Sequence, residues 1–200
     1  MNATDLAAWL RLTLIPGVGG EAQRHLLGAF GLPDAIFSAG FPALRGVVGG
    51  ALAERLVSHD CNAEIEATLA WAGQTGNRVV TLADADYPQA LLATTDPPVL
   101  LYVKGRTELL NRPAIAIVGS RNATHQGEAN AGAFAQTLSR SGLTIVSGLA
   151  LGIDAAAHRG ALGEAGSTIA VIGTGADRIY PSQKFSLVLR VLFLCFLVLL

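Results

Sequence analysis

The chain has 200 residues, of which 51% are hydrophobic and 14% charged, a composition that excludes an intrinsically disordered protein and allows a sizeable core. Its net charge of −1 excludes binding of nucleic acid through a general basic surface, so such binding requires a local cluster of cations. Cys61 and Cys195 lie far apart and predict neither a disulfide framework nor a metal site. Residues 1–9 lack the basic start and apolar segment of a signal peptide, so we expect a cytoplasmic protein.

Residues 6–71 are predicted to form short helices separated by glycines. A helix over residues 6–14 is expected to stop at residues 16–20 (PGVGG), and another to follow over residues 21–30. This pattern is typical of a helix-hairpin-helix, whose turn presents backbone N–H groups to a phosphate, and residues 44–56 form a looser copy. Two interpretations stay open: the helices contact DNA, or the glycines only let small helices pack closely.

Residues 73–78 (GQTGNR) are rich in turn-forming residues and mark the best domain boundary. We therefore expect a helical N-terminal domain over residues 1–75. A Rossmann-like domain is expected over residues 76–183, followed by an apolar tail over residues 184–200.

In the second domain, strands and helices alternate. Strands are expected at residues 79–82, 99–103, 114–118, 143–146 and 167–172, and helices at residues 89–92, 128–140 and 155–162. Three of the strands run directly into glycine-rich turns, at residues 119–124, 147–154 and 173–175. This alternation predicts an α/β fold, a Rossmann-like parallel sheet that is incomplete at its C-terminal end. In such sheets, ligands bind beyond the carboxyl ends of the strands, where the turns lie.

The first two turns carry residue types that can hold a phosphate: backbone N–H groups, a hydroxyl and a guanidinium. The candidate binding residues are Gly119, Ser120, Arg121, Asn122, Gly148, Gly152 and Lys104. Gly148 and Gly152 would allow close approach of the backbone to a phosphate. Arg121 could pair with a phosphate, and the alternative is that it pairs with a carboxylate such as Asp154 or Asp177. Lys104 and Arg178 could form a basic rim or could be merely solvated.

Asp154 is predicted to be the N-cap of the helix over residues 155–162, a contact that stabilises a helix by about 1 kcal/mol. Asp154 and His158 lie four residues apart, a spacing that could indicate acid–base catalysis or a metal site. No third ligand or nucleophile accompanies them, so we predict no catalytic residue, no metal and no cofactor. A structural or a surface role is expected for His158.

Several stretches in this order resemble the DNA-processing protein A (DprA/Smf) family. They are residues 87–88 (YP), 97–105 (PPVLLYVKG), 117–121 (IVGSR), 147–158 (SGLALGIDAAAH) and 179–181 (IYP), and the resemblance covers residues 6–183. It implies a Rossmann-like domain behind a helical, SAM-like domain in the bacterial cytosol. It also implies a protein that binds single-stranded DNA, protects it, and helps load the RecA recombinase during natural transformation, without enzymatic activity. In the family, the arginine at the position of Arg121 faces the DNA backbone.

Two departures from the family pattern affect these expectations. The family usually has an aromatic residue just before the glycine matching Gly127, where this chain has Gln126, so base stacking is not expected there. From residue 184 the chain is almost wholly apolar, which we interpret as the product of a frame change ahead of a premature stop. A tail anchor, a buried strand and a buried helix are the alternatives.

The tail also bears on the membrane and on partners. Arg190 is followed by ten apolar residues, fewer than the roughly 20 that a spanning helix needs, so no membrane association is expected. The family's homodimer and RecA surfaces belong to later segments. We therefore expect those surfaces to be absent here and the activity to be reduced or lost.

Two other classes of protein share parts of this pattern. A dinucleotide-dependent oxidoreductase requires G-x-G-x-x-G after its first strand, and residues 119–124 do not supply it, while residues 173–178 lack the third glycine. A nucleotide phosphoribohydrolase has a similar fold, but its expected Pro-Gly-Gly-x-Gly-Thr-x-x-Glu loop is absent. The phosphoribohydrolase remains the alternative. Turnover of a nucleoside monophosphate would favour it, and salt-sensitive binding of oligo-dT without turnover would favour DNA binding.

Overall fold

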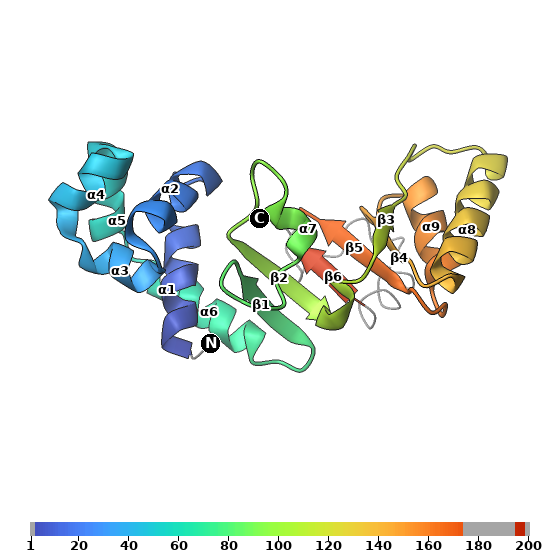
Figure 1. Cartoon of the computed structure of the whole chain (residues 1–200), viewed down its shortest axis with the longest axis horizontal. Helices are drawn as coiled ribbons and strands as arrows, with labels where there is room; N and C mark the ends of the chain where they lie inside the picture. The colour runs from blue at the N-terminus through green and yellow to red at the C-terminus, as the bar shows by residue number, and fades with distance from the viewer. Residues whose placement is uncertain (1–2, 174–194, 199–200) are drawn as a thin grey trace. The chain divides into compact units, whose positions relative to one another are not determined.

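The structure is a computed structural model that describes residues 3–173 and 195–198 (Figure 1). The chain divides into two compact units. The helical unit comprises Met1–Thr75, Thr81–Asp84 and Ala90–Leu100, and the sheet unit comprises Gly76–Val80, Ala85–Gln89 and Leu101–Leu200.

The helical unit is built from short amphipathic helices. They are α1 (Ala3–Leu14), α2 (Gly20–Phe30), α3 (Pro33–Ser38), α4 (Gly40–Val48), α5 (Gly50–Ser58) and α6 (Asn62–Ala72). Gly17, between α1 and α2, has φ +85°, and Gly49, between α4 and α5, has φ +80°, conformations that favour glycine. Both glycine-linked helix pairs expected from the sequence are therefore present.

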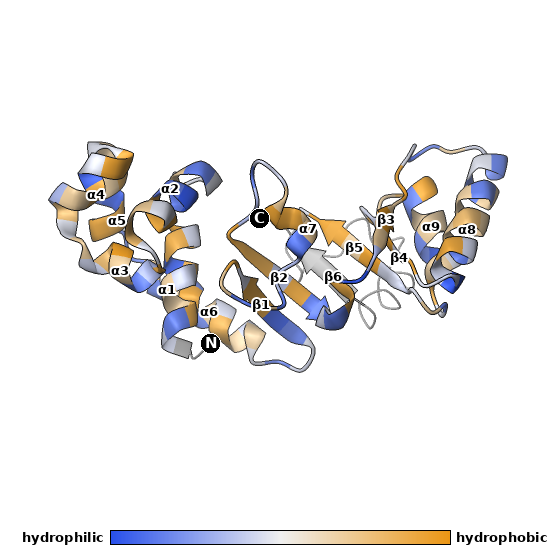
Figure 2. Cartoon of the chain, in the orientation of Figure 1, coloured by the Kyte–Doolittle hydropathy of each residue, from blue (hydrophilic) through white to orange (hydrophobic). Residues whose placement is uncertain are grey.

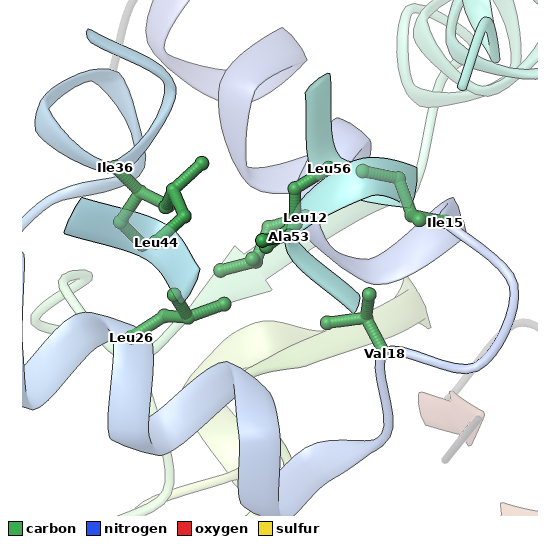
Figure 3. Close-up of a cluster of buried hydrophobic side chains, with 8 residues drawn as sticks. All are labelled: Leu12, Ile15, Val18, Leu26, Ile36, Leu44, Ala53 and Leu56. Atoms are coloured by element: carbon green, nitrogen blue, oxygen red, sulfur yellow. The ribbon is translucent and has the colours of Figure 1, made fainter. Parts of the chain in front are cut away.

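One apolar cluster holds these helices together. Its buried members are Leu12, Ile15, Val18, Leu26, Ile36, Leu44, Ala53 and Leu56 (Figure 3). They come from α1 to α5 and from the turn after α1. Each short helix contributes only one or two of these side chains, so its stability comes from packing against the others rather than from its own length.

The sheet unit contains a mixed sheet with the strand order β1-β2-β6-β5-β4-β3. The strands are β1 (Asn77–Thr81), β2 (Leu100–Gly105), β3 (Ala114–Ala116), β4 (Thr144–Ser147), β5 (Thr168–Ile172) and β6 (Cys195–Val198). Strands β3 to β6 are mutually parallel, and β2 runs antiparallel to β6. Figure 2 shows β2 and β5 as largely hydrophobic, as is usual inside a sheet that contains parallel strands.

Two crossover helices connect the parallel strands, which confirms the predicted α/β, Rossmann-like fold. Helix α8 (His125–Arg140) links β3 to β4, and α9 (Ile153–Ala161) links β4 to β5. The short helices α7 (Gln89–Leu92) and η1 (Thr107–Leu109) lie in the loops before β3.

The core under α8 and α9 centres on Ile145 of β4, which packs with Ala135 of α8 and Ala157 of α9. The two helices also touch each other through their backbones, because a Cβ added to Gly160 would overlap the carbonyl oxygen of Gly132. This close approach requires glycine at the contact.

Strand β6 comes from the segment expected to be an apolar tail outside the family fold. It pairs with β5 on one side and with β2 on the other, so β5 is not left as an unpaired edge. Of the alternatives for residues 184–200, a strand therefore describes Cys195–Val198, and residues 184–194 lie outside the described part. None of the helices in the described ranges combines the length and the hydropathy that a bilayer span requires.

Candidate nucleic-acid interface

Two glycine-containing turns meet at one edge of the sheet. The first turn (residues 117–124) follows β3 and the second turn (residues 148–152) follows β4. Because β3 and β4 are parallel neighbours, their carboxyl ends lie at the same edge. The first turn ends at Thr124, whose Oγ1 accepts a hydrogen bond from the Gly127 N–H at 3.0 Å and caps α8.

The two turns are packed directly against each other. The Ile153 N–H donates to the Ser120 carbonyl at 3.2 Å. Gly152 has φ +71°, and a Cβ added there would overlap the Ser120 carbonyl oxygen and lie 2.9 Å from that of Arg121. The close approach predicted at Gly152 is therefore made by the protein's own backbone, and Gly152 is buried.

Asp154 joins both turns. Its side chain is only 5% exposed, and its two oxygens accept from the Gly119 N–H at 3.4 Å and the Ala150 N–H at 3.2 Å. The prediction that Asp154 is an N-cap is wrong: α9 begins at Ile153, and its N-cap is Gly152, without a side-chain cap. Asp154 is thus the second residue of α9. A carboxylate near the N-terminus of a helix is also favoured by the helix dipole.

Ser120, Arg121 and Asn122 are exposed on the first turn. The Ser120 Oγ accepts a hydrogen bond from the Asn122 N–H at 3.1 Å, so the hydroxyl proton of Ser120 remains available to an acceptor. Gly119 is also exposed, but its N–H is directed to Asp154. In the second turn, Gly148 is exposed, and a Cβ there would lie 3.0 Å from Asp154 Oδ2.

Arg121 differs from most arginines of the described chain. Arginines whose guanidinium contacts a carboxylate, a carbonyl or a ring are Arg11, Arg24, Arg55, Arg78, Arg106, Arg112, Arg140 and Arg159. Within residues 4–173, Arg121 has no such contact, and Asp154 does not pair with it. The other carboxylate considered for Arg121, Asp177, lies outside the described residues, as does Arg178.

Lys104 is not brought next to the turns. It lies on β2 opposite Phe196 of β6, and β6 and β5 separate β2 from β4. At the usual spacing of neighbouring strands, three strand intervals put Lys104 about 14 Å from β4.

Two features of the second turn were not predicted. The Ser147 hydroxyl donates to the Ile117 carbonyl at 2.7 Å and so ties the end of β4 to the first turn. Leu149 has φ +57° and is 7% exposed, a backbone conformation that is uncommon for a residue other than glycine. The glycines on both sides marked the turn, but no local pattern assigned the strained position to Leu149.

Of the two roles expected for His158, the structure shows a structural one, because the side chain is fully buried. Its Nδ1 lies 2.8 Å from the Thr168 hydroxyl, which donates to the Ile145 carbonyl at 2.7 Å. Because the single hydroxyl proton is used in that bond, Nδ1 of His158 must be the donor to Thr168. Asp154 and His158 thus serve different contacts. The residues described here contain no group of three His, Cys, Asp or Glu side chains placed to hold a metal.

The chain is similar to known proteins over most of its length. The family model for DNA recombination-mediator protein A matches residues 78–197, a match that continues past residue 183, where the sequence resemblance was expected to stop. Protein Smf of Synechocystis sp. is 36% identical over 190 residues, covering 92% of this chain and 48% of the relative. DNA processing protein DprA of Streptococcus pneumoniae is 50% identical over 104 residues, covering 52% of this chain and 36% of the relative.

Solved structures agree with these relatives. The X-ray structure of DNA processing protein A from Streptococcus pneumoniae superimposes with a TM-score of 0.77 and 30% identity, covering 99% of this chain and 67% of that one. DNA processing protein A from Helicobacter pylori, which has a single-stranded DNA binding mode, gives 0.53 and 33% over 60% of this chain and 54% of that one.

The similarity covers only part of each relative but most of this chain's sheet unit. The chain spans less than half the length of the curated relatives that it matches. The family match itself covers more than half of the chain, from the start of the sheet through β6. The chain therefore belongs to the DNA recombination-mediator protein A (DprA/Smf) family.

Proposed function

We propose that this chain binds single-stranded DNA along the edge formed by the first and second turns. In this proposal Arg121 pairs with a backbone phosphate, and the Ser120 hydroxyl donates a hydrogen bond to it. The DNA backbone then passes along three exposed residues of the two turns, Gly119, Asn122 and Gly148. Gly152 contributes by holding the turns together, and Lys104 contacts the DNA farther along its backbone.

The observation that carries this proposal is the state of Arg121. An exposed guanidinium without a carboxylate partner in residues 4–173 lies where two parallel strands end, which is where ligands of such sheets bind. A guanidinium group pairs well with a phosphate, because it is always positively charged and can donate two parallel hydrogen bonds to the phosphate oxygens. The Helicobacter pylori relative, with its single-stranded DNA binding mode, supports the choice of ligand.

We further propose, from the family resemblance, that the protein acts in the cytoplasm in natural transformation, protects incoming DNA and helps load RecA, without catalytic turnover. RecA loading and dimerisation are proposed to depend on the segments by which the relatives are longer.

The test is a titration of fluorescein-labelled oligo-dT, followed by anisotropy at several salt concentrations. Arg121→Ala should weaken binding about tenfold or more, because a charged hydrogen bond contributes about 1.5–3 kcal/mol. It should also reduce the salt dependence by about one phosphate contact. Arg140→Ala is the matched control, since Arg140 already pairs with Glu164; its affinity should stay close to that of the wild type.

Two further measurements complete the test. Lys104→Ala should weaken binding only about twofold, because Lys104 lies beyond a Debye length from the turns. Incubation with nucleoside monophosphates should yield no free base. Unchanged affinity in Arg121→Ala would remove the proposed site, and release of base would revive the phosphoribohydrolase alternative.

A further inference from the structure

The feature that DNA binding leaves unexplained is a buried negative charge at the proposed site. Asp154 is 5% exposed and lies between the two turns. A carboxylate next to a phosphate site repels the ligand, and burial reduces the screening of that repulsion. In terms of charge alone, Asp154 opposes the proposed function, so its presence requires another explanation.

Asp154 is placed to hold the two turns in one arrangement. Its Oδ1 accepts from Gly119 in the first turn and its Oδ2 from Ala150 in the second. A side chain that accepts from two separate turns fixes their spacing, because each oxygen can reach its amide only in a narrow range of positions. The bond from the Ile153 N–H to the Ser120 carbonyl closes the same junction from the opposite direction.

We infer that Asp154 is a positioning residue for DNA binding: it locks the first turn onto the second so that Arg121 is presented to the phosphate before DNA arrives. This inference rests on the proposed function and assigns no contact between Asp154 and DNA. The bonds to Gly119 and Ala150 hold the backbone on either side of the phosphate path, so the side chains of Ser120 and Arg121 start from a fixed turn.

The first experiment replaces Asp154 by asparagine and measures binding of oligo-dT. The amide has one acceptor oxygen, and its NH₂ group would face one of the two N–H donors, so one half of the lock is lost. Electrostatics alone predicts tighter binding, because a negative charge is removed. A positioning role predicts the opposite sign, a loss of about tenfold or more. Affinity equal to or above that of the wild type would overturn the inference.

Two matched controls separate positioning from charge and from stability. Glu128→Gln removes a negative charge from α8 of the same unit, and its affinity should be unchanged or slightly higher. Thr168→Val disrupts the buried bonds to His158 and Ile145, away from the turns. It should lower the unfolding midpoint while leaving the affinity unchanged. If Thr168→Val weakens binding as much as Asp154→Asn, general destabilisation explains both and the inference fails.

A measurement on the wild-type chain covers the case in which Asp154→Asn does not fold. The Gly119 and Ala150 amides should exchange with deuterium more slowly than in a free chain, and this protection should be present before oligo-dT is added. Protection that develops only with DNA, or free-chain exchange throughout, would overturn the inference.

The outcomes also distinguish this inference from the proposed function. If Arg121→Ala weakens binding and Asp154→Asn does not, only the role of Asp154 is lost. If neither variant changes the affinity, the proposed site fails as well.

Discussion

The glycine-rich turns of the helical unit and those of the sheet unit are alike in sequence, yet they use their glycines differently. In the helical unit, a Cβ added to Gly49 would meet open space, and one on Gly17 would overlap only the tip of the Arg55 side chain. In the sheet unit, a Cβ on Gly152 would collide with the backbone of the first turn, and one on Gly119 would collide with the Ile153 side chain of α9. Gly17 and Gly49, both at positive φ, therefore serve backbone conformation, whereas Gly119 and Gly152 also serve close packing.

The cations beside these turns differ in the same way. At the first hairpin, which is the turn between α1 and α2, the Arg55 guanidinium donates to the Pro16 carbonyl at 3.0 Å and lies against Gly17. Arg24 of α2 pairs with Asp96. In the sheet unit, Arg121 has no such contact within residues 4–173. An arginine near a glycine turn thus indicates a phosphate site only where its guanidinium has no partner within the protein. Because Arg55 and Arg24 both have such partners, a packing role is favoured for the first hairpin.

The largest expected effect breaks the close packing in the sheet unit. Gly152→Ala should lower the free energy of unfolding by about 3 kcal/mol, as the sum of backbone strain at positive φ and overpacking against Ser120. Gly49→Ala carries the strain without the collision and should cost only about 1–2 kcal/mol. Hydrogen exchange of β4 and β5 during urea unfolding measures the first, and Trp9 and Trp71, both in the helical unit, report the second. Equal costs would show that the glycines of the two units do not differ in this way.

A smaller effect is expected at the hairpin cation. Arg55→Ala should destabilise the helical unit by about 0.5–1.5 kcal/mol through loss of the bond to Pro16, detected as a lower urea midpoint of tryptophan fluorescence. Its affinity for oligo-dT should match the wild type, the reverse of Arg121→Ala. Weaker DNA binding at unchanged stability would instead make the hairpin a DNA contact.

The smallest effect concerns an arginine that is already engaged, Arg140. Its hydrogen bond to Glu164, with a second from Gln136, lowers the pKa of Glu164 from its ordinary value of 4.5. Because the folded-state pKa is the lower one, the pair stabilises the protein above pH 4.5 and loses this effect as the pH falls through the folded value. Glu164→Gln should therefore have a slightly lower urea midpoint than the wild type near neutral pH. A difference that persists well below pH 4 would show another cause.

The fold was largely predictable because its signals are local. Apolar runs ending in glycine predicted β4 and β5 to within a residue, and helical spacing predicted α9 to within two. Helix α8 begins three residues earlier than expected because Thr124 supplies its cap. The order of the strands, with β6 between β2 and β5, could not be inferred, since it depends on pairing between distant segments.

The candidate site was predictable only in part, for the same reason. The first turn was correctly placed at the end of a strand, because an apolar run followed by a glycine turn is a local pattern, and the DNA contacts of its residues stay a prediction. The sequence placed Asp154 at a helix start, where an N-cap is the usual role. Its actual partners, Gly119 and Ala150, include an amide 35 residues away. The separation of Lys104 from the turns likewise follows from strand order.

The backbone contact between Gly132 and Gly160 has a mechanical consequence for the two turns. Helix α8 extends from the first turn and α9 from the second, and at this contact the helices meet without intervening side chains. This contact fixes the distance between the two helices, and the bonds of Asp154 fix the two turns at their ends, so we expect the turns to move together. The conformational entropy of bringing the two turns together is therefore lost when the chain folds. A polynucleotide then binds to turns that are already in place.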